Sequence, residues 1–443
     1  MHCTTLEKTG VPTVSIEAEV FASLGKMYAG LVGMPNHRMV TVPHPISRVP
    51  ASVCRDYIKG NDPITGKPII DEIIEALTRP LTPEDMRSGT QERSESRLIG
   101  PDTEETLHRL FLENIWTDYL PIVLPTEERV AAILKGTSHE PDEVVGELRS
   151  GYEACTFTVE QVAANAVLAG AKPEYMPVIL AVAASGAPAI ATSTQSFGRM
   201  IVINGPIRNE IGMNSGTGAL SPMNRANAVI GRVATLISIN LGAGGVPNKT
   251  YWGSQGNVTN YSHVTFAENE EFLPEGWEPF HVQLGYKPEE SAMSIFHGYS
   301  LFHWKDTYEK TKIDSILNMA SRILPSGGYK SGLSLLLDPI VANDLVSEGF
   351  LAKESVSKHV YEKTLLPLGE YWQYHLVNGF SLPMGQKGIE PYASWLKQPG
   401  DTLINRYRSA DDITVLVVGG RTNDFWQAGD FHLIGSFSVD EWR

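Results

Sequence analysis

The sequence is poor in cysteine, poor in positive charge and free of long apolar runs. Its three cysteines, Cys3, Cys54 and Cys155, are too few and too scattered for a disulfide framework or a zinc cage. The 36 Lys and Arg are outnumbered by 51 Asp and Glu, and a formal net charge of −15 disfavours binding to the phosphate backbone of nucleic acids. No stretch approaches about 18 uninterrupted apolar residues, so we expect no membrane span.

The first ten residues also lack a basic segment followed by an apolar one. We therefore expect no signal peptide, and the cytoplasm is the default location. What the sequence does contain is typical of a folded globular protein: 42% hydrophobic, 9% aromatic and 20% charged residues among 443. At about 150 residues per domain, this length predicts two to four domains.

The N-terminal segment predicts a β-α-β unit. Residues 2–8 are typical of the last turns of a helix that ends at Gly10, and residues 11–16 of a short strand. Residues 17–33 carry apolar side chains at helical spacing, and residues 37–43 predict a second strand. Such a unit implies a parallel pair of strands. Because it is too small for a whole domain, we predict that residues 1–80 are the C-terminal part of an α/β domain.

The rest of the chain predicts a connecting region and a larger domain. Residues 81–143 are interpreted as a linker followed by helices, and residues 144–443 as a mixed domain without strict alternation of strands and helices. The predicted helices of the connecting region are 104–113 and 126–134. Those of the larger domain include one opened by a Thr158–Gln161 capping box and one from Pro222 to about Asn240. Its predicted strands are 200–204, 263–267, 280–284 and 414–418, with 177–184 either helix or strand and 290–380 mainly helical.

The fold class expected from these patterns is α/β. It combines a partial Rossmann-like β-α-β domain at the N-terminus with a larger mixed α+β domain.

A glycine-rich loop after a buried strand is the first candidate binding site. The strand ends at Asn204, and a loop with several glycines leads to a helix that we expect Ser221 to cap. Backbone N–H groups and the helix dipole favour an anion at such a helix start. The candidate binding residues are Asn204, Asn214, Ser215, Thr217, Asn224 and Arg225. A carboxylate or phosphate is the expected guest, and the alternative is a tight turn whose side chains only satisfy backbone groups.

An acidic segment after another strand is the second candidate. If that strand continued, Glu268 and Glu270 would point to one face, and His281 follows soon after them. A carboxylate among carboxylates has a raised pKa and can act as a general acid near neutral pH. Glu268, Glu270 and His281 are therefore candidate catalytic residues, and the alternative is a solvated acidic turn. The pattern identifies neither a metal nor a cofactor.

Several segments together resemble a known family. The run LEKTGVPTVSI…LVGMP…VTVPHPI, from Leu6 to Ile46, resembles the C-terminal half of the UGSC-type (seleno)protein domain, and the blocks GMNSGTG and AENEE…WEPFHV resemble longer proteins that carry this domain. The family is distantly similar to the selenoprotein B component of glycine, sarcosine and betaine reductases. The resemblance implies thiol or selenol chemistry on a small substrate.

The sequence departs from this family in its reactive segment. The Cys-Gly-Ser-Cys loop is expected about one helix before Leu6, and no cysteine of the chain matches it; Cys3 would lie on the helix after the loop. Ala171 also stands where relatives often have Cys. Two explanations remain open: Met1 is an internal residue of a longer protein, or the chain is a variant that works without the thiol pair.

Three functions follow from these patterns. The first is an enzyme with thiol-dependent redox or nucleophilic chemistry on a small carboxylate-bearing molecule, as the resemblance implies. The second is a thiol-independent lyase or hydratase that uses Glu268, Glu270 and His281. The third is a non-catalytic partner subunit, since a truncated β-α-β unit leaves an open sheet edge. The expected partners are a small anionic substrate and a second copy or partner chain, without nucleic acid or membrane.

Overall fold

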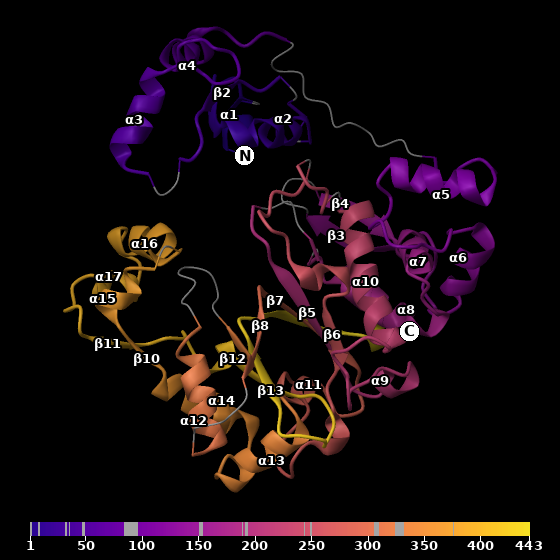
Figure 1. Cartoon of the computed structure of the whole chain (residues 1–443). Helices are drawn as coiled ribbons and strands as arrows, with labels where there is room; N and C mark the ends of the chain where they lie inside the picture. Colours follow the sequence, from indigo (N-terminus) through magenta and orange to yellow (C-terminus); the bar gives the residue numbers. More distant parts are fainter. Residues whose placement is uncertain are drawn as a thin grey trace.

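The computed structural model has the mixed helices and sheets of the expected α/β class (Figure 1). The structure describes residues 1–443 except 1, 8, 32, 35, 47–48, 84–95, 150–153, 188, 191–193, 243, 249, 305–309, 324–331 and 375. No described helix is both long and apolar enough to cross a membrane.

The N-terminal elements form the predicted β-α-β unit. Strands β1 (Ser15–Ala18) and β2 (Met39–Val42) pair in parallel, and α2 (Ala22–Leu31) connects them. The side chains of Val40 and Val42 pack on Ile69, which begins helix α4. The remaining helices of the unit are α1 (His2–Glu7), α3 (Ala51–Lys59) and α4 (Ile69–Thr78). In Figure 1 these elements, in indigo, form a group of their own.

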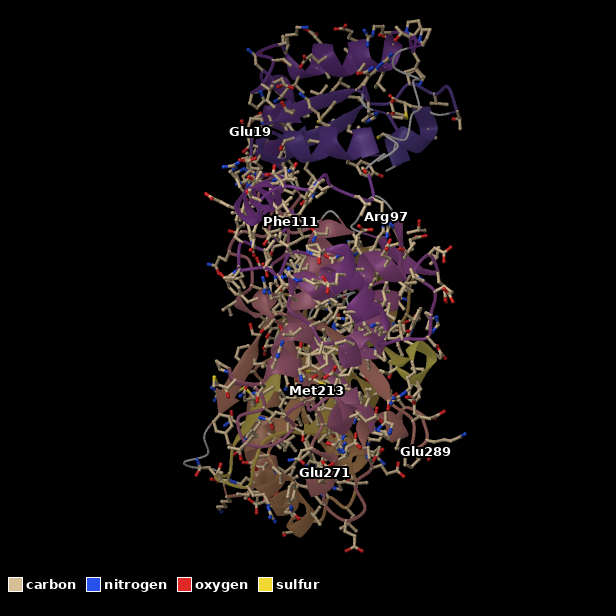
Figure 2. The ribbon with its side chains drawn as sticks, turned by 90° about the vertical axis from the view of Figure 1, so that its right-hand side faces the viewer. Glu19, Arg97, Phe111, Met213, Glu271 and Glu289 are labelled. Atoms are coloured by element: carbon tan, nitrogen blue, oxygen red, sulfur yellow. The ribbon has the colours of Figure 1, made fainter. Side chains whose placement is uncertain are left out.

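The connecting region contains the two predicted helices. Helix α5 (Glu104–Glu113) begins after Thr103 and α6 (Glu127–Leu134) after Thr126, and each threonine side chain accepts a backbone N–H of the first turn. Arg97, which precedes them, pairs with Glu160 at 2.6 Å and lies beside these helices (Figure 2). Most of the predicted linker, residues 84–95, lies outside the described part of the chain.

The larger region is built on two four-stranded mixed sheets. The first has the order β14-β7-β5-β6, in which β5 and β6 are parallel and the other neighbours antiparallel. The second has the order β12-β9-β13-β8, in which β12 and β9 are parallel. The strands are β5 (Gly198–Asn204), β6 (Val264–Ala267), β7 (Ala292–Gly298), β8 (Leu301–Trp304), β9 (Leu333–Leu337), β12 (Ile413–Val417), β13 (Trp426–Gly429) and β14 (His432–Ser438).

The two sheets pack face to face through alternate residues of their strands. Met200 and Val202 of β5 share one apolar cluster with Leu336 of β9 and Leu416 of β12, so this cluster lies between the sheets. Because both faces of β5 are covered, the strand is continuously apolar from Met200 to Ile203 rather than alternating.

Helices cover the two outer faces, which gives four layers. Ile201 and Ile203 point to the helical side of the first sheet, where α7 (Val159–Leu168), α8 (Met176–Ala184) and α10 (Arg225–Asn240) pack. Leu335 and Leu337 point to the opposite side of the second sheet, covered by α12 (Lys312–Ala320), α13 (Pro339–Ser347) and α14 (Lys353–Lys363).

A smaller cluster, an antiparallel pair of strands and a short helix complete the described elements. The antiparallel strands β10 (Leu365–Pro367) and β11 (Leu403–Asn405) join α15 (Leu368–Tyr371), α16 (Leu382–Gln386) and α17 (Tyr392–Trp395) around their own apolar cluster. Strands β3 (Val144–Arg149) and β4 (Ala154–Thr158) form an antiparallel pair that leads into α7. The short helix α9 (Ile207–Glu210) follows β5.

Several local predictions are confirmed and others are wrong. The Thr158–Gln161 capping box opens α7, and Gly170 follows that helix with φ +73°. Residues 280–284 are not a strand, because Phe280 begins the one-turn helix α11 (Phe280–Gln283) after Pro279. Residues 290–380 also contain strands β7, β8 and β9, and the residues of β7 and β9 are buried on both faces, so these two strands show no strand alternation. Helix α10 begins at Arg225 after Asn224, three residues later than predicted, so Ser221 does not cap it.

Helix α10 approaches the first sheet so closely that one position must be glycine. A Cβ on Gly231 would lie 1.7 Å from the carbonyl oxygen of Ser262, just before β6. We expect Gly231→Ala to lower the free energy of unfolding by about 2 kcal/mol or more, since the backbone has to move. Urea unfolding measures this. Ala228→Ser, on the exposed side of the same helix, is the control and should stay within about 0.5 kcal/mol of the wild type. Equal stability of both variants would contradict the close approach.

Candidate functional site

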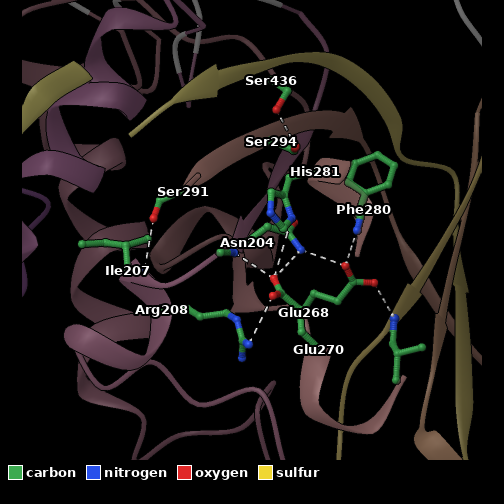
Figure 3. A network of polar contacts seen from close by, with 12 residues as sticks. Asn204, Ile207, Arg208, Glu268, Glu270, Phe280, His281, Ser291, Ser294 and Ser436 are labelled. Carbon is green, nitrogen blue, oxygen red and sulfur yellow. Dashed lines mark hydrogen bonds and ion pairs between the residues drawn. The ribbon is translucent and has the colours of Figure 1, made fainter. Parts of the chain in front are cut away.

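The acidic segment and the end of β5 meet in one buried cluster, shown in Figure 3. Strand β6 ends at Ala267, so Glu268 and Glu270 are not held by the strand continuation that the sequence suggested. They converge on Asn204 instead: its Nδ2 donates to Glu268 Oε2 at 2.8 Å and to Glu270 Oε1 at 3.0 Å. Asn204 and Glu268, predicted for different sites, therefore belong to the same cluster.

Glu268 is fully buried and accepts hydrogen bonds from four directions. Besides Asn204, its donors are the backbone N–H of Phe280 at 2.7 Å and that of Val417 at 3.2 Å. The fourth donor is Lys353 Nζ at 2.6 Å, whose side chain is 2% exposed. A carboxylate so completely engaged holds its surroundings in place and has little freedom to exchange protons with a substrate.

Glu270 and Glu271 are held by a cation that the sequence analysis missed. Arg208 Nη2 lies 3.3 Å from Glu270 Oε2 and 2.7 Å from Glu271 Oε1, and its Nη1 donates to Glu271 Oε2 at 2.8 Å. The hydrogen bonds from Arg208 lower the pKa of Glu271 to about 2. Arg208 lies in α9, directly after β5. An arginine in the first turn after a buried strand is the feature of the sequence that could have indicated this cation.

His281 lies beside Glu270 in the interior. Its Nδ1 is 3.9 Å from Glu270 Oε1, and the ring is fully buried. Neither ring nitrogen has a hydrogen-bond partner among the described residues, and the same is true of Asn204 Oδ1. The three predicted catalytic residues thus lie near one another, with Asn204 between the two carboxylates and His281 beside Glu270. Only Glu270, whose side chain is 13% exposed, touches the surface.

The polar side chains of the glycine-rich loop mostly bind the loop itself. Asn214 Nδ2 donates to Asn224 Oδ1 at 2.8 Å and to the carbonyl of Thr217 at 3.1 Å. Asn224 Nδ2 in turn donates to the carbonyl of Gly218 at 2.7 Å. The carbonyl of Ser215 accepts the backbone N–H of Gly419 at 2.8 Å, which joins this loop to the end of β12.

Arg225 occupies a different place from the other loop residues. It is the first residue of α10, is exposed, and donates from Nη2 to the carbonyl of Gly170 at 3.2 Å. The loop is thus closed by Asn214 and Asn224, while Arg225 points to the end of α7.

A cavity of about 360 Å³ lies between this loop and the carboxyl ends of β9 and β12. The carboxyl ends of parallel strands are where open α/β sheets bind their ligands. A Cβ on Gly420 would lie 1.9 Å from Thr217 Oγ1, so the two walls of the cavity touch there. The lining residues are Thr217, Gly218, Ala219, Leu220, Ser221, Leu336, Asp338, Val418, Gly419, Gly420, Thr422, Asn423, Phe425 and Gln427.

Asp338 is the carboxylic acid of this cavity, and the sequence analysis did not identify it. It caps α13 by accepting the N–H of Val341 at 2.8 Å, and it accepts the N–H of Phe425 at 2.7 Å. Burial raises its pKa above the usual range of an aspartate. The signal was available: Asp-Pro directly after the apolar strand LSLLL marks a strand end followed by a helix.

Within the described part of the chain, no three or more His, Cys, Asp or Glu side chains are grouped so that they could hold a metal ion. Cys3 and Cys54 are free and half-buried, and both lie in the N-terminal unit.

The Glu268–Lys353 ion pair predicts a large effect of a single substitution. Lys353→Met leaves the Glu268 carboxylate buried without its cation, and we expect it to lower the free energy of unfolding by about 3–5 kcal/mol. The double variant Glu268→Gln, Lys353→Met removes both charges and should be more stable than the single variant. Urea unfolding of the three proteins tests this. A double variant as unstable as Lys353→Met would show that the pairing of charge is not the cause.

Glu271 predicts a pH dependence with a defined sign. Its pKa of about 2 in the folded state is below the ordinary value of 4.5, so its contribution to stability is complete above pH 4.5 and disappears as the pH falls towards 2. The stability difference between the wild type and Glu271→Gln should therefore shrink between pH 5 and pH 2, as measured by urea unfolding. Glu278→Gln, at an exposed carboxylate nearby, is the control and should show no such trend.

Comparison with known proteins agrees with the resemblance in the N-terminal unit. Residues 3–60, from α1 to the end of α3, match the model of the UGSC family. No curated protein matches the chain. The resemblance to the UGSC family is therefore confirmed, over residues 3–60.

Proposed function

We propose that the chain is an enzyme that binds a small carboxylate-bearing molecule in the cavity at the carboxyl ends of β9 and β12. The observation that carries this proposal is that the loop expected to hold an anion forms one wall of that cavity. A volume of about 360 Å³ suits a small molecule.

Unused donors on the cavity wall support an anionic ligand. The backbone N–H groups of Thr217, Gly218 and Gly420 have no hydrogen-bond partner among the described residues, and neither has the hydroxyl of Thr217. Three N–H groups and a hydroxyl on one cavity are a suitable set of donors for a carboxylate.

Asp338 supplies the acid/base group of the proposed site. Burial raises its pKa, and it lines the same cavity as Thr217. No cysteine is among the residues that line this cavity in the described structure. Thiol-dependent chemistry stays what the UGSC resemblance implies.

Binding to the cavity is tested with Thr217→Val, which removes the hydroxyl and keeps the shape. Thermal shift assays with a panel of small carboxylates, and with the matching amides, should show stabilisation by carboxylates alone. We expect Thr217→Val to weaken the best carboxylate about tenfold, equivalent to about 1.4 kcal/mol. Isothermal titration measures the difference.

Two further variants locate the anion. Ser394→Ala, at an exposed serine of α17, should bind like the wild type. Arg225→Ala distinguishes the cavity from the helix start expected from the sequence. If it abolishes binding while Thr217→Val leaves it unchanged, the anion lies at the start of α10 and not in the cavity.

A lyase or hydratase that uses Glu268, Glu270 and His281 is a second candidate. The observation in its favour is that His281 lies 3.9 Å from Glu270 with both ring nitrogens unbonded among the described residues. Once a substrate is known, a bell-shaped pH–rate profile that is unchanged by thiol alkylation supports this candidate. Full activity of Glu270→Gln and His281→Ala would exclude it.

The partner-subunit alternative draws on the N-terminal unit. The side chains of Ile70, Ile74 and Leu77 in α4 are 46%, 53% and 46% exposed, which makes an apolar stripe on that helix. Light scattering of the purified chain tests for a homo-oligomer. The cytoplasmic location and the lack of nucleic-acid binding also stay predictions from the sequence.

A further inference from the structure

Three side chains of the N-terminal unit form a continuous hydrogen-bonded chain. Glu7 Oε2 lies 2.8 Å from His37 Nδ1, and His37 Nε2 lies 2.7 Å from Ser15 Oγ. The carboxylate contacts one ring nitrogen and the hydroxyl contacts the other, so the imidazole connects them. All three residues lie within the segment that matches the UGSC family.

The local fold brings these residues together from three elements. Glu7 ends α1, Ser15 begins β1, and His37 stands two residues before β2. The backbone N–H of Ser15 donates to the carbonyl of Arg38 at 3.0 Å, which fixes the serine beside the histidine. The second carboxylate oxygen of Glu7 accepts the N–H of Thr13 at 3.3 Å, which fixes the acid.

The two hydrogen-bond partners of His37 determine which ring nitrogen carries the proton. The side chain of Glu7 is 0% exposed and that of His37 is 3% exposed. With Glu7 ionised, the imidazole proton belongs on Nδ1, where it is donated to the carboxylate. The lone pair of Nε2 is then directed to Ser15, whose hydroxyl donates to it. This is the arrangement in which a histidine can act as the general base of a serine, with the acid holding the ring.

We propose that Ser15, His37 and Glu7 form a nucleophilic serine site that reacts with activated acyl groups. Ser15 is half-buried, so a reagent can reach it while the acid and the imidazole stay covered. Glu7 acts as a positioning residue, because within the described part of the chain its carboxylate is bonded to the histidine and to the backbone N–H of Thr13.

The proposed reaction is an acyl transfer in two steps. Ser15 Oγ forms a bond to the carbonyl carbon of an ester or thioester as its proton moves to His37 Nε2. The bond from the carbonyl carbon to the leaving group breaks, and His37 gives the proton to the leaving alkoxide or thiolate. Water then gives a proton to His37 Nε2 as its oxygen forms a bond to the acyl carbon. The bond from that carbon to Ser15 Oγ breaks, His37 returns the proton to Ser15, and the acid is released. Ser15 N–H is bonded to Arg38 and so is not available as an oxyanion donor, which suits activated esters and thioesters better than amides.

The same chain offers an internal comparison. Thr235 Oγ1 lies 3.0 Å from His263 Nε2, which repeats the contact between a hydroxyl and an imidazole. His263 Nδ1 has no hydrogen-bond partner among the described residues, so this pair lacks the acid, and both residues are buried. It should not react.

The experiment is labelling of the full chain with a fluorophosphonate probe, followed by peptide mass spectrometry. In this reaction Ser15 Oγ forms a bond to phosphorus, fluoride leaves, and the hydroxyl proton passes through His37 to solvent. We expect Ser15 to be labelled at least about 100-fold faster than the exposed Ser394. Ser15→Ala should abolish this label, and His37→Gln should reduce its rate about 100-fold. Thr235 should stay unlabelled.

Rescue by a conservative variant separates positioning by Glu7 from a merely structural role. Glu7→Gln should slow the labelling of Ser15, because the ring of His37 loses the carboxylate that holds it, and Glu7→Asp should recover part of the rate. Glu17→Gln, at a second carboxylate on β1, should slow the labelling less than Glu7→Gln.

Folding of each variant is checked by its thermal melt, so that a lost label is not confused with a lost structure. The proposal is overturned if a folded wild type leaves Ser15 unlabelled, or labels it no faster than Ser394. It is equally overturned if the label on Ser15 forms at the wild-type rate in folded His37→Gln, or if the probe modifies Cys3 in place of Ser15.

Discussion

The arrangement of the larger region depends on the buried carboxylate of Glu268. Glu268 follows β6. It accepts hydrogen bonds from the side-chain amide of Asn204 at the end of β5 and from the N–H of Val417 on β12. It also accepts hydrogen bonds from the first N–H of α11 and from the ammonium of Lys353 on α14. One side chain thereby joins elements of both sheets. A buried charge is tolerated only when its partners are all in place, so these elements are held in a single relative position.

The cavity follows from this constraint. Asn269, next to Glu268, donates its backbone N–H to Val417 at 2.8 Å and its side-chain amide to the carbonyl of Gly419 at 2.8 Å. The chain after β12 is therefore fixed where the loop of residues 214–221 reaches it, and Ser215 accepts the N–H of Gly419. The acidic cluster and the cavity are thus adjacent, connected by the backbone of residues 417–419. The acidic cluster thus supports one wall of the cavity. This explains why Glu268 is buried and why other residues line the cavity.

The sequence predicted those helices whose start depends on a few neighbouring residues. The capping box of Thr158 opens α7 where expected, because a cap needs only the next three residues. The segment from β7 to β9 was misread, because a strand with both faces covered has no alternation to distinguish it from a buried helix. Residues 280–284 failed for a related reason: five residues with alternating apolar character fit one helical turn after Pro279 equally well.

The hydrogen-bond partners of the acidic segment could not be predicted from the sequence. Glu268, Glu270 and His281 are close in sequence and lie near one another in the structure, but Lys353 lies 85 residues from Glu268 and no local pattern marks it. Asp338 and Gly419 lie beside the glycine-rich loop because β9 pairs with β12. No pattern in the sequence predicts that pairing. The same holds for Ser15 and His37, because a register of two parallel strands sets their contact and no motif of adjacent residues does.

The two reactive arrangements also divide the chemistry between parts of the chain. The confirmed UGSC resemblance covers residues 3–60, which contain Cys3, Ser15 and His37 but none of the residues that line the cavity. Nucleophilic chemistry of the kind that the family implies is therefore a property to seek in the N-terminal unit, where an imidazole is already directed at a hydroxyl. The cavity instead offers donors for an anion and one buried acid. Binding and nucleophilic reaction are consequently separable, since a substitution in one set of residues leaves the hydrogen bonds of the other intact.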